Sequence, residues 1–468
     1  MKEVALLVFT ESTQREDAFK SRVSYLEEEL KNFISRIGDS VKLIRINPGY
    51  IRSKTDLRCA VANLRSLQDV CCCILYAGTF VNASDVAMAA RLISIPCILI
   101  GNHNSNTVSK IGFLAAAGAI AQAGLHVKRI DGDINDEKVK ESVIAFARAA
   151  DASNKLLGET YGLIGGRSLG ISTNVSDSAQ WLKLFGVDIE HIDQLEIVSR
   201  ASSVPSSRID LYKKWVHEKF GQVNFSKGRF EDFQLEKMIR SYLALKEIAE
   251  TYRLDFAGVK CQSEMSNGYV IMCFALSLMN EAFDAEGKKK TIPTSCEGDS
   301  DGALTMEILK HVSDGKPVTL QDVFKFEGER TLVLANCGAG APFYSAYSDD
   351  PDANLKNVFL QPHGFGAAGG ASMQFNYAPG TNTLARLTRD NLQYKMLITC
   401  GRVLEKTRED LKNYSWFRPT SIMELEVPGE ILASHLDSNH MLTVYGDYTR
   451  ELVEFCKIKG IPYDLMVD

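Results

Sequence analysis

The sequence predicts an α/β protein with two doubly wound domains, each built on a parallel sheet, followed by a β-rich C-terminal domain. Strand and helix patterns alternate through the first 155 residues and start again at Tyr161, which is typical of βαβ units. From about residue 340 the helical patterns thin out, and Gly-rich turns separate short β runs. We therefore expect domains at residues 1–155, 156–342 and 343–468.

The first domain shows five strand patterns, each followed by a helix pattern. The expected strands are Val4–Phe9, Val41–Ile46, Cys71–Leu75, Pro96–Ile100 and Val127–Ile130. The expected helices are Arg15–Ile37, Lys54–Leu67, Ser84–Ser94, Val108–Gly124 and Glu137–Ala150. This spacing favours a parallel sheet with helices on both faces.

The second and third domains show more irregular patterns. In the second we expect strands at Tyr161–Ile164, Phe256–Lys260 and Thr331–Ala335, and helices at Ser178–Phe185, within 207–255, and at Val270–Ala282. In the third we expect strands at Val358–Leu360, Ala371–Tyr377, Asn382–Leu387 and Lys395–Val403, then the helix Tyr448–Lys459 and the strand Tyr463–Val467.

Length, composition and charge exclude several classes of protein. The 468 residues are 45% hydrophobic and 24% charged, and at roughly 100–200 residues per domain this length suggests about three domains. The net charge of −6 and the lack of a long basic run argue against a nucleic-acid partner. Apolar stretches such as 111–123 are shorter than the roughly 20 residues that span a bilayer. The N-terminus is typical of a strand and not of a signal peptide, so we expect a cytoplasmic protein without a membrane partner.

The glycine and cysteine patterns point away from two other kinds of site. Gly165-Gly166 follows a strand, but the turn lacks GxGxxG, which argues against a dinucleotide site. The 11 cysteines include no CxxC pair. They are typical of buried free thiols in a reducing compartment.

An acidic cluster between two glycines is the densest group of chemically active residues. Glu297, Asp299 and Asp301 precede a helix pattern. Acids at this place can serve the helix dipole and the N-cap. The other interpretation is that Glu297 sits in a turn facing a cleft while Asp299 or Asp301 caps the helix, and such oxygen ligands suit Mn²⁺ or Mg²⁺.

Three further residues are candidates, each with a structural alternative. Asp322 stands among apolar neighbours, where an N-cap role is equally expected. His363 and His440 are two of only 8 histidines, and an isolated His is more often structural. The strand near 334–341 ends in small residues, which permit close backbone approach to a ligand.

Taken together, these motifs resemble the L-fucose isomerase family, and more distantly L-arabinose isomerase. The resemblance is carried by Glu297 in Glu-Gly-Asp-Ser-Asp-Gly, by Asp322 in an Asp-Val strand, by the Asn-Cys-Gly strand end, and by Asn439-His440. It is strongest over 256–340 and 430–468. The resemblance implies two α/β domains and a β-rich domain, and a homo-oligomer such as a trimer or hexamer.

The resemblance also implies the chemistry. Glu297, Asp322 and His440 match the family's ligands for Mn²⁺, for which Mg²⁺ or Co²⁺ are substitutes, and Asn439 matches the Asn beside the His. The expected reaction interconverts an aldose and a ketose, of the L-fucose, D-arabinose or L-arabinose kind, through an ene-diol. Moving a proton between two carbons needs an acid and a base, and we assign that work to Glu297 and Asp322. A neutral His440 would be a ligand only.

Residues that contact the sugar are less well defined. Lys260, Gln262 and Glu264 are candidates, although a strand end and helix cap would explain them equally well. Phe80 follows a strand where the family places a substrate loop, often one that reaches a neighbouring subunit.

Two rival functions stay open at this point. A sugar-binding homologue without turnover has no need of two carboxylates and a His. A nucleotide-dependent oxidoreductase is disfavoured by the missing GxGxxG.

Overall fold

The computed structural model describes residues 1–11, 16–411, 414 and 418–467. The chain divides into two compact units, Met1–Asn154 and Lys155–Asp468. Parallel sheets in the N-terminal part and a seven-stranded sheet in the C-terminal part confirm the predicted fold class. None of the helices in the described residues has the length and apolar character needed to cross a membrane.

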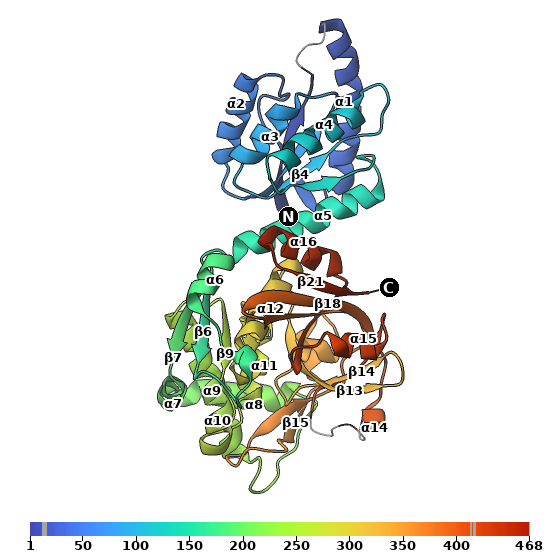
Figure 1. The fold of residues 1–468 in the computed structure, drawn as a ribbon. Coiled ribbons are helices and arrows are strands. Elements are labelled where there is room, and N and C mark those ends of the chain that lie inside the picture. Colours follow the sequence, from blue (N-terminus) through green and yellow to red (C-terminus); the bar gives the residue numbers. More distant parts are fainter. Residues whose placement is uncertain (12–15, 412–413, 415–417, 468) are drawn as a thin grey trace. The chain divides into compact units, whose positions relative to one another are not determined.

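The first unit is a five-stranded parallel sheet with helices on both faces (Figure 1). Its strands are β1 (Lys2–Phe9), β2 (Val41–Arg45), β3 (Val70–Ala77), β4 (Cys97–Ile100) and β5 (Lys128–Ile130), in the order β2-β1-β3-β4-β5. Its helices are α1 (Glu16–Ile37), α2 (Lys54–Arg65), α3 (Ala83–Leu92), α4 (Ser109–Gln122) and α5 (Glu137–Lys155). This order is one of the common doubly wound arrangements.

Continuous apolar strands build the core of the first unit. All eight residues of β3 are buried, as expected for a strand covered on both faces. Leu57 of α2, Val86 of α3 and Phe113 of α4 belong to one core cluster with residues of the central strands. The predicted strands and helices of this region are confirmed to within a few residues.

The second unit begins with a four-stranded parallel sheet. Its strands are β6 (Thr160–Ile164), β7 (Asp188–Ile192), β9 (Phe256–Val259) and β12 (Thr294–Ser295), in the order β12-β9-β6-β7. Its helices are α6 (Ser178–Leu184), α7 (Gln194–Ser203), α8 (Ser206–Lys219), α9 (Asp232–Thr251), α10 (Glu264–Gly268), α11 (Cys273–Met279) and α12 (Ser300–Val312), with the 3₁₀ turns Ser172–Asn174 and Cys296–Gly298.

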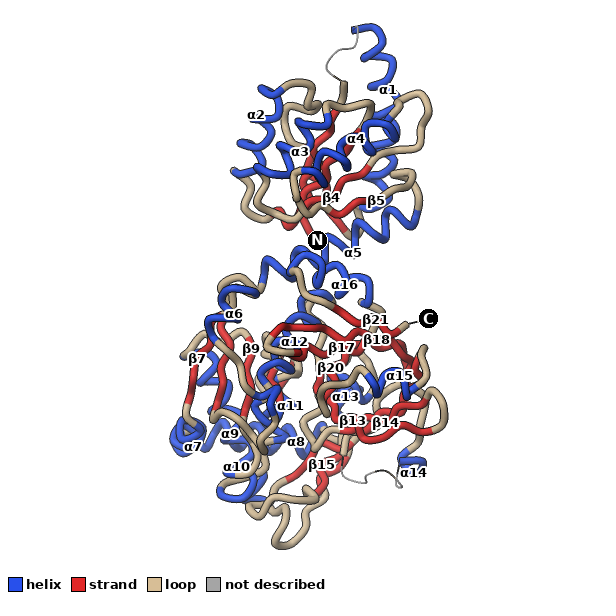
Figure 2. Tube along the Cα trace, viewed as in Figure 1, coloured by secondary structure: helices blue, strands red, loops and turns tan. Residues whose placement is uncertain are grey.

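A ring of antiparallel strands forms the rest of the second unit (Figure 2). Its strands are β13 (Thr319–Glu327), β14 (Thr331–Ala335), β17 (Gly380–Asp390), β18 (Gln393–Val403), β19 (Thr420–Leu425) and β20 (His440–Tyr445), with β21 (Tyr463–Met466) added beside β18. The order is β17-β20-β13-β14-β19-β18, and β17 also pairs with β18. The six strands therefore close on themselves.

Smaller elements surround the ring. They are β8 (Gln222–Val223), β15 (Phe359–Pro362) and β16 (Ala371–Gln374) in one sheet, the hairpin of β10 (Phe283–Asp284) and β11 (Gly287–Lys288), the helices α13 (Pro351–Leu355), α14 (Arg408–Leu411), α15 (Gly429–Ser434) and α16 (Thr449–Lys459), and the 3₁₀ turn Pro342–Ser345.

The ring starts earlier in the chain than the β-rich region expected from the sequence. Strands β13 and β14 lie within the range expected for the second α/β domain, yet they pair with β20 and β19. These two strands belong to the ring because their backbones pair with strands far away in the sequence. The local sequence around β13 and β14 carries no signal of that pairing. The bounds of the three expected domains themselves stay a prediction.

Helix α12 links the two sheets of the second unit. All of its residues are buried, and it contacts β9 and β12 of the parallel sheet as well as β17, β20 and β13 of the ring. Figure 1 shows α12 between these two groups of strands. Residues just before α12 therefore lie where the parallel sheet and the ring meet.

Candidate active site

Glu297 lies in the tight turn between β12 and α12. It has a positive φ of 61°, and the following Gly298 has a φ of 67°. A Cβ on Gly298 would approach the Gly166 carbonyl oxygen to 2.8 Å, so a glycine is required there. The main-chain carbonyl of Glu297 accepts a hydrogen bond from Asn174 Nδ2 at 2.8 Å. The turn thus gives the Glu297 carboxyl a defined position.

Asp322 and His440 are direct partners across two strands of the ring. Strand β13 pairs antiparallel with β20, with Asp322 opposite His440. Asp322 is therefore a strand residue, and the alternative that it caps a helix is wrong. His440 Nε2 lies 3.4 Å from Asp322 Oδ1 and 3.5 Å from Glu297 Oε2. The structure thus brings together the three residues expected to hold a metal.

The other nitrogen of His440 is held by a buried acid. His440 Nδ1 lies 2.7 Å from Asp299 Oδ2, and Arg386 of β17 donates to both oxygens of Asp299 at 2.7 and 3.0 Å. Asp299 also accepts from the Gly302 N–H at 3.0 Å, which confirms its predicted role as the α12 N-cap. An imidazole bonded in this way on Nδ1 directs Nε2 toward the two other carboxyls.

Sequence reasoning missed both the Asp299–His440 contact and Arg386. The available signal was a single arginine in an apolar strand pattern, Leu384-Ala385-Arg386-Leu387, because a buried arginine needs an acidic partner. Asp301 was the other possible cap. It instead bonds Arg389 at 2.9 Å and accepts from Tyr394 OH at 2.9 Å.

Burial and charge shift the pKa values of the site in opposite directions. Burial raises the pKa of Glu297 to about 7, although His440 acts to lower it. For Asp299, burial acts to raise the pKa, but Arg386 and His440 outweigh it and hold the pKa well below the usual range. For His440, burial acts to lower the pKa, but bonds to Asp299 and Asp322 raise it to about 10. The two acids thus favour the protonated ring of His440, whereas the neutral ring expected from the sequence belongs to the cation-bound site and stays a prediction.

The site combines burial with access to solvent. The side chain of His440 is 1% exposed and that of Glu297 is 15% exposed, whereas that of Asp322 is 37% exposed. A small molecule can therefore approach the cluster from the Asp322 side, while His440 and Asp299 form its buried wall.

The residues expected to contact a sugar are placed in different ways. Asn439 donates to Asp322 Oδ1 at 3.4 Å and so lies at the cluster. Lys260 pairs with Glu264 at 2.6 Å, and Gln262 accepts from Ser266 Oγ at 3.1 Å. Phe80, 40% exposed, belongs to the first unit. The sugar contacts of these residues stay predictions.

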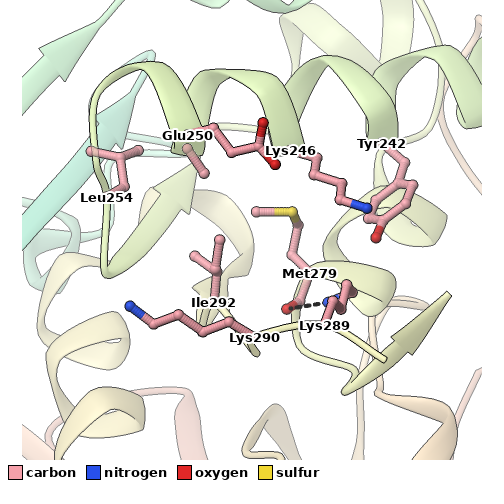
Figure 3. Close-up of a pocket in the computed structure, with 9 residues that line it drawn as sticks. Tyr242, Lys246, Glu250, Leu254, Met279, Lys289, Lys290 and Ile292 are labelled. Carbon is pink, nitrogen blue, oxygen red and sulfur yellow. Dashed lines mark hydrogen bonds between the residues drawn. The ribbon is translucent and has the colours of Figure 1, made fainter. Parts of the chain in front are cut away.

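A separate pocket of about 220 Å³ lies beside α9 (Figure 3). Lys246, Lys289 and Lys290 line it together with apolar side chains. Lys246 pairs with Asp284 at 2.9 Å and Lys290 with Asp255 at 2.9 Å, while Lys289 donates to the Met279 carbonyl at 3.4 Å. With acids already neutralising Lys246 and Lys290, this pocket is a weaker candidate than the Glu297 cluster.

The donor set of the Glu297 cluster fits a divalent cation. His440 Nε2 lies 3.5 Å from a carboxyl oxygen of Glu297 and 3.4 Å from one of Asp322, and oxygen with imidazole donors suits ions such as Mn²⁺. The Asp299 bond to Nδ1 supplies the outer partner that metal-binding histidines usually have.

Comparison with known proteins gives a consistent family. Residues 334–467, which include Arg386 and His440, match the family model described as L-fucose isomerase, C-terminal domain. Sulfoquinovose isomerase of Alkalicoccus urumqiensis is 23% identical over 400 residues, covering 82% of this chain and 83% of that protein. The corresponding enzyme of Clostridium sp. (strain MSTE9) is 22% identical over 433 residues, covering 88% and 91%.

A shorter match has higher identity. L-fucose isomerase of Haemophilus influenzae (strain PittEE) is 31% identical over 97 residues, which is 20% of this chain and 16% of that enzyme. The family model and these relatives agree with each other and with the resemblance carried by Glu297, Asp322 and Asn439-His440. The family model over residues 334–467 and these relatives therefore support a fucose isomerase-like family for this chain.

Proposed function

We propose that this protein is a metal-dependent aldose–ketose isomerase whose active site is formed by Glu297, Asp322 and His440. The observation that carries the proposal is the position of His440 Nε2, which lies 3.5 Å from Glu297 and 3.4 Å from Asp322. Relatives that match most of this chain are named sulfoquinovose isomerase, and others are named L-fucose isomerase.

Glu297 has the properties of a group that moves a proton. Burial raises its pKa to about 7, and a cation bound beside it would act in the opposite direction and favour the carboxylate. A group with a pKa near the working pH is the most efficient general acid–base catalyst. Glu297 can therefore take a proton from one sugar carbon, and Asp322, on the exposed side of the cluster, can serve the neighbouring carbon or its oxygen.

The role of His440 is to bind the cation through a ring that is held in one orientation. Asp299 fixes its Nδ1 at 2.7 Å, so the ring cannot turn away from the two carboxyls. Binding of a cation by Glu297, Asp322 and His440 requires the proton on Nε2 to leave, since only the neutral imidazole nitrogen is a ligand. When bound, a divalent ion offsets the negative charge that develops on the sugar oxygens during proton transfer.

Mn²⁺ is the ion we propose, with Mg²⁺ or Co²⁺ as substitutes, because the donors are carboxyl oxygens and one imidazole. We propose an aldose of the L-fucose, D-arabinose or L-arabinose kind as substrate. The names of the relatives add sulfoquinovose to the sugars to be tested.

A screen of aldoses tests the proposal. The protein is freed of metal, supplied with Mn²⁺, and incubated with each of these four sugars, and ketose formation is measured. We expect one sugar to give a ketose only when the cation is present. Tight binding of an aldose with no ketose from any sugar would contradict the proposal and favour a sugar-binding protein without turnover.

A further inference from the structure

Three thiols and one imidazole form a buried cluster beside the turn that carries Glu297. Cys273 begins α11, Cys296 precedes Glu297, Cys337 follows β14, and His363 follows β15. All four residues are buried, with exposed fractions from 3% to 8%. Four segments far apart in the sequence thus place polarizable side chains at one point.

The distances within the cluster are short. Cys337 Sγ lies 3.4 Å from Cys296 Sγ and 4.0 Å from Cys273 Sγ. Cys273 Sγ lies 3.6 Å from His363 Nε2. One ligand atom from each of Cys273, Cys337 and His363 lies within 4.8 Å of the others.

These separations agree with those around a tetrahedral ion. A Zn–S bond of about 2.3 Å and a Zn–N bond of about 2.0 Å place neighbouring ligand atoms about 3.5–3.8 Å apart. Three of the separations lie between 3.4 and 4.0 Å. Cys273, Cys337 and His363 thus lie close enough to share one ion, and Cys296, which contacts Cys337, would have to move toward the other two to complete the set.

The surroundings of His363 favour coordination through Nε2. Its Nδ1 lies 3.0 Å from the Phe365 carbonyl oxygen, and metal-binding histidines usually donate their other N–H to such an acceptor. Nε2 lies 2.6 Å from the Cys337 carbonyl oxygen. An ion bound to Nε2 would replace the proton that this bond uses.

Cys337 lies between two other thiols of the cluster. Its Sγ lies 4.0 Å from that of Cys273 and 3.4 Å from that of Cys296. Thiolate is the form of cysteine that binds metals.

We propose that Cys273, Cys296, Cys337 and His363 form a second cation site, specific for a soft ion of the Zn²⁺ class. Thiolate and imidazole donors select such ions, whereas the carboxyl groups of the Glu297 cluster select harder ions such as Mn²⁺. The two sites meet at Cys296 and Glu297, which are consecutive residues, so an ion held by Cys296 would also fix the main chain at Glu297.

Cys261 is the neighbour that this assignment leaves out. Its Sγ lies 3.3 Å from Cys296 Sγ, and it is also buried. We place it on the outer side of the cluster, because its thiol contacts that of Cys296. It provides a matched control, since Cys261→Ser changes a buried thiol beside the site and keeps the four ligands.

Titration with Co²⁺ under anaerobic, reducing conditions tests the proposal. A thiolate-bound tetrahedral Co²⁺ gives an intense sulfur-to-metal charge-transfer band and strong visible bands. We expect these bands to saturate at one equivalent and to disappear when Zn²⁺ is added. They should persist in Glu297→Gln, because the carboxyl site is separate, and in Cys261→Ser. Cys337→Ser and His363→Ala should lose or strongly alter them.

Two results would overturn the proposal. If reduced, folded wild-type protein gives only the weak bands of oxygen-bound Co²⁺, the thiols are packing residues and hold no ion. If Cys261→Ser abolishes the charge-transfer band while His363→Ala keeps it, the ion is bound by four thiols and the assignment of His363 is wrong. Neither result depends on isomerase activity, so a failed sugar screen and a failed cobalt titration are distinguishable.

Discussion

Each end of helix α12 carries a group of acids and a histidine, but the ratio of carboxyl groups to basic side chains differs between the two groups. At the C-terminal end, His311 Nε2 lies 2.9 Å from Glu159 and 3.1 Å from Glu307, and Lys310 also pairs with Glu307. Two carboxyl groups therefore meet two bases. At the N-terminal end, Arg386 and His440 meet three carboxyl groups, those of Asp299, Glu297 and Asp322.

The N-terminal group, which has the excess of carboxyl groups, is also the more exposed of the two. The Glu307 side chain is fully buried and His311 is 10% exposed, whereas the Asp322 side chain is 37% exposed. A group of acids and a histidine is thus a candidate cation site when two conditions hold. The carboxyl groups outnumber the basic side chains that pair with them, and at least one carboxyl group is exposed to solvent. The ligand atoms of Glu159, Glu307 and His311 also lie within 4.8 Å of one another, but Lys310 and His311 offset both carboxyl charges and Glu307 is fully buried.

The largest expected difference between the two ends is in turnover. Glu297→Gln removes the carboxyl group that moves the proton and should lower kcat by roughly 10²–10⁴. Glu159→Gln, at the other end of α12, should leave kcat within about threefold because it lies outside the proposed site. Steady-state ketose formation with the sugar identified in the screen gives both values. Similar losses in the two variants would abolish the distinction between the ends.

The second prediction compares Asp299, the partner of His440, with Asp301, which is equally buried but contacts Arg389 instead. Asp299→Asn loosens His440 and should weaken Mn²⁺ binding by roughly 10–100-fold, as expected for an outer partner of a ligand. Asp301→Asn breaks the contact with Arg389 instead, so its Mn²⁺ affinity should stay near the wild-type value. Both variants should lose stability, since Asp299→Asn leaves the buried Arg386 and Asp301→Asn leaves the partly buried Arg389 without its charge partner. Equilibrium dialysis of the folded variants measures the difference, and equal Mn²⁺ affinities would contradict the role given to Asp299.

The C-terminal group should give a pH-dependent stability. Burial alone would lower the pKa of His311, but Glu159 and Glu307 outweigh it and raise the pKa above the usual 6.5. The folded protein therefore binds this proton more tightly than the unfolded chain, so the stabilisation is full below about pH 6.5 and is lost as pH rises through the folded-state pKa.

His311→Gln measures this contribution. The variant should be about 1–3 kcal/mol less stable than wild type in mildly acidic buffer, and the difference should shrink on the alkaline side. His191→Gln, which changes an exposed histidine of β7 in the same unit, should show no such trend in denaturant unfolding. A difference that grows with pH would show that His311 is neutral in the folded protein.

The smallest expected effect concerns Asn439. Its bond to Asp322 Oδ1 is long, at 3.4 Å, so Asn439→Ala should lower kcat/KM by only about tenfold, the lower limit for a residue that orients a ligand. The same assay used for Glu297→Gln gives the value. A loss as large as that of Glu297→Gln would place Asn439 in direct contact with the reacting sugar.

The sequence predicted the elements of the first unit well because its strands are continuous apolar runs. Strand β3 is buried along its whole length, and such a run has few alternatives. Strand β7 was missed because it lies at the edge of its sheet, where only Ile189 and Ile192 are buried. The sequence did not decide whether Asp322 lies in a strand or caps a helix. Strand β13 is defined by its pairing with β20, which lies more than a hundred residues away.

The site was predictable only in part, for the same reason. Glu297, Asp322 and His440 came from motifs whose order resembles a known family. Asp299 was one of two residues predicted as the cap, but its bonds to Arg386 and His440 join residues 87 and 141 positions away. No local pattern contains such contacts, because they arise when α12 is packed against the ring.

The most direct test of the account is the turnover of Asp322→Asn with the cation site verified as full. The variant keeps the shape of the side chain and one oxygen donor but loses its charge and its basic oxygen. Bound Mn²⁺ is measured in the same sample as ketose formation. The account predicts that kcat falls by roughly 10²–10⁴ with Mn²⁺ bound. Near wild-type turnover in fully loaded protein would contradict it, because Asp322 would then have no part in proton transfer.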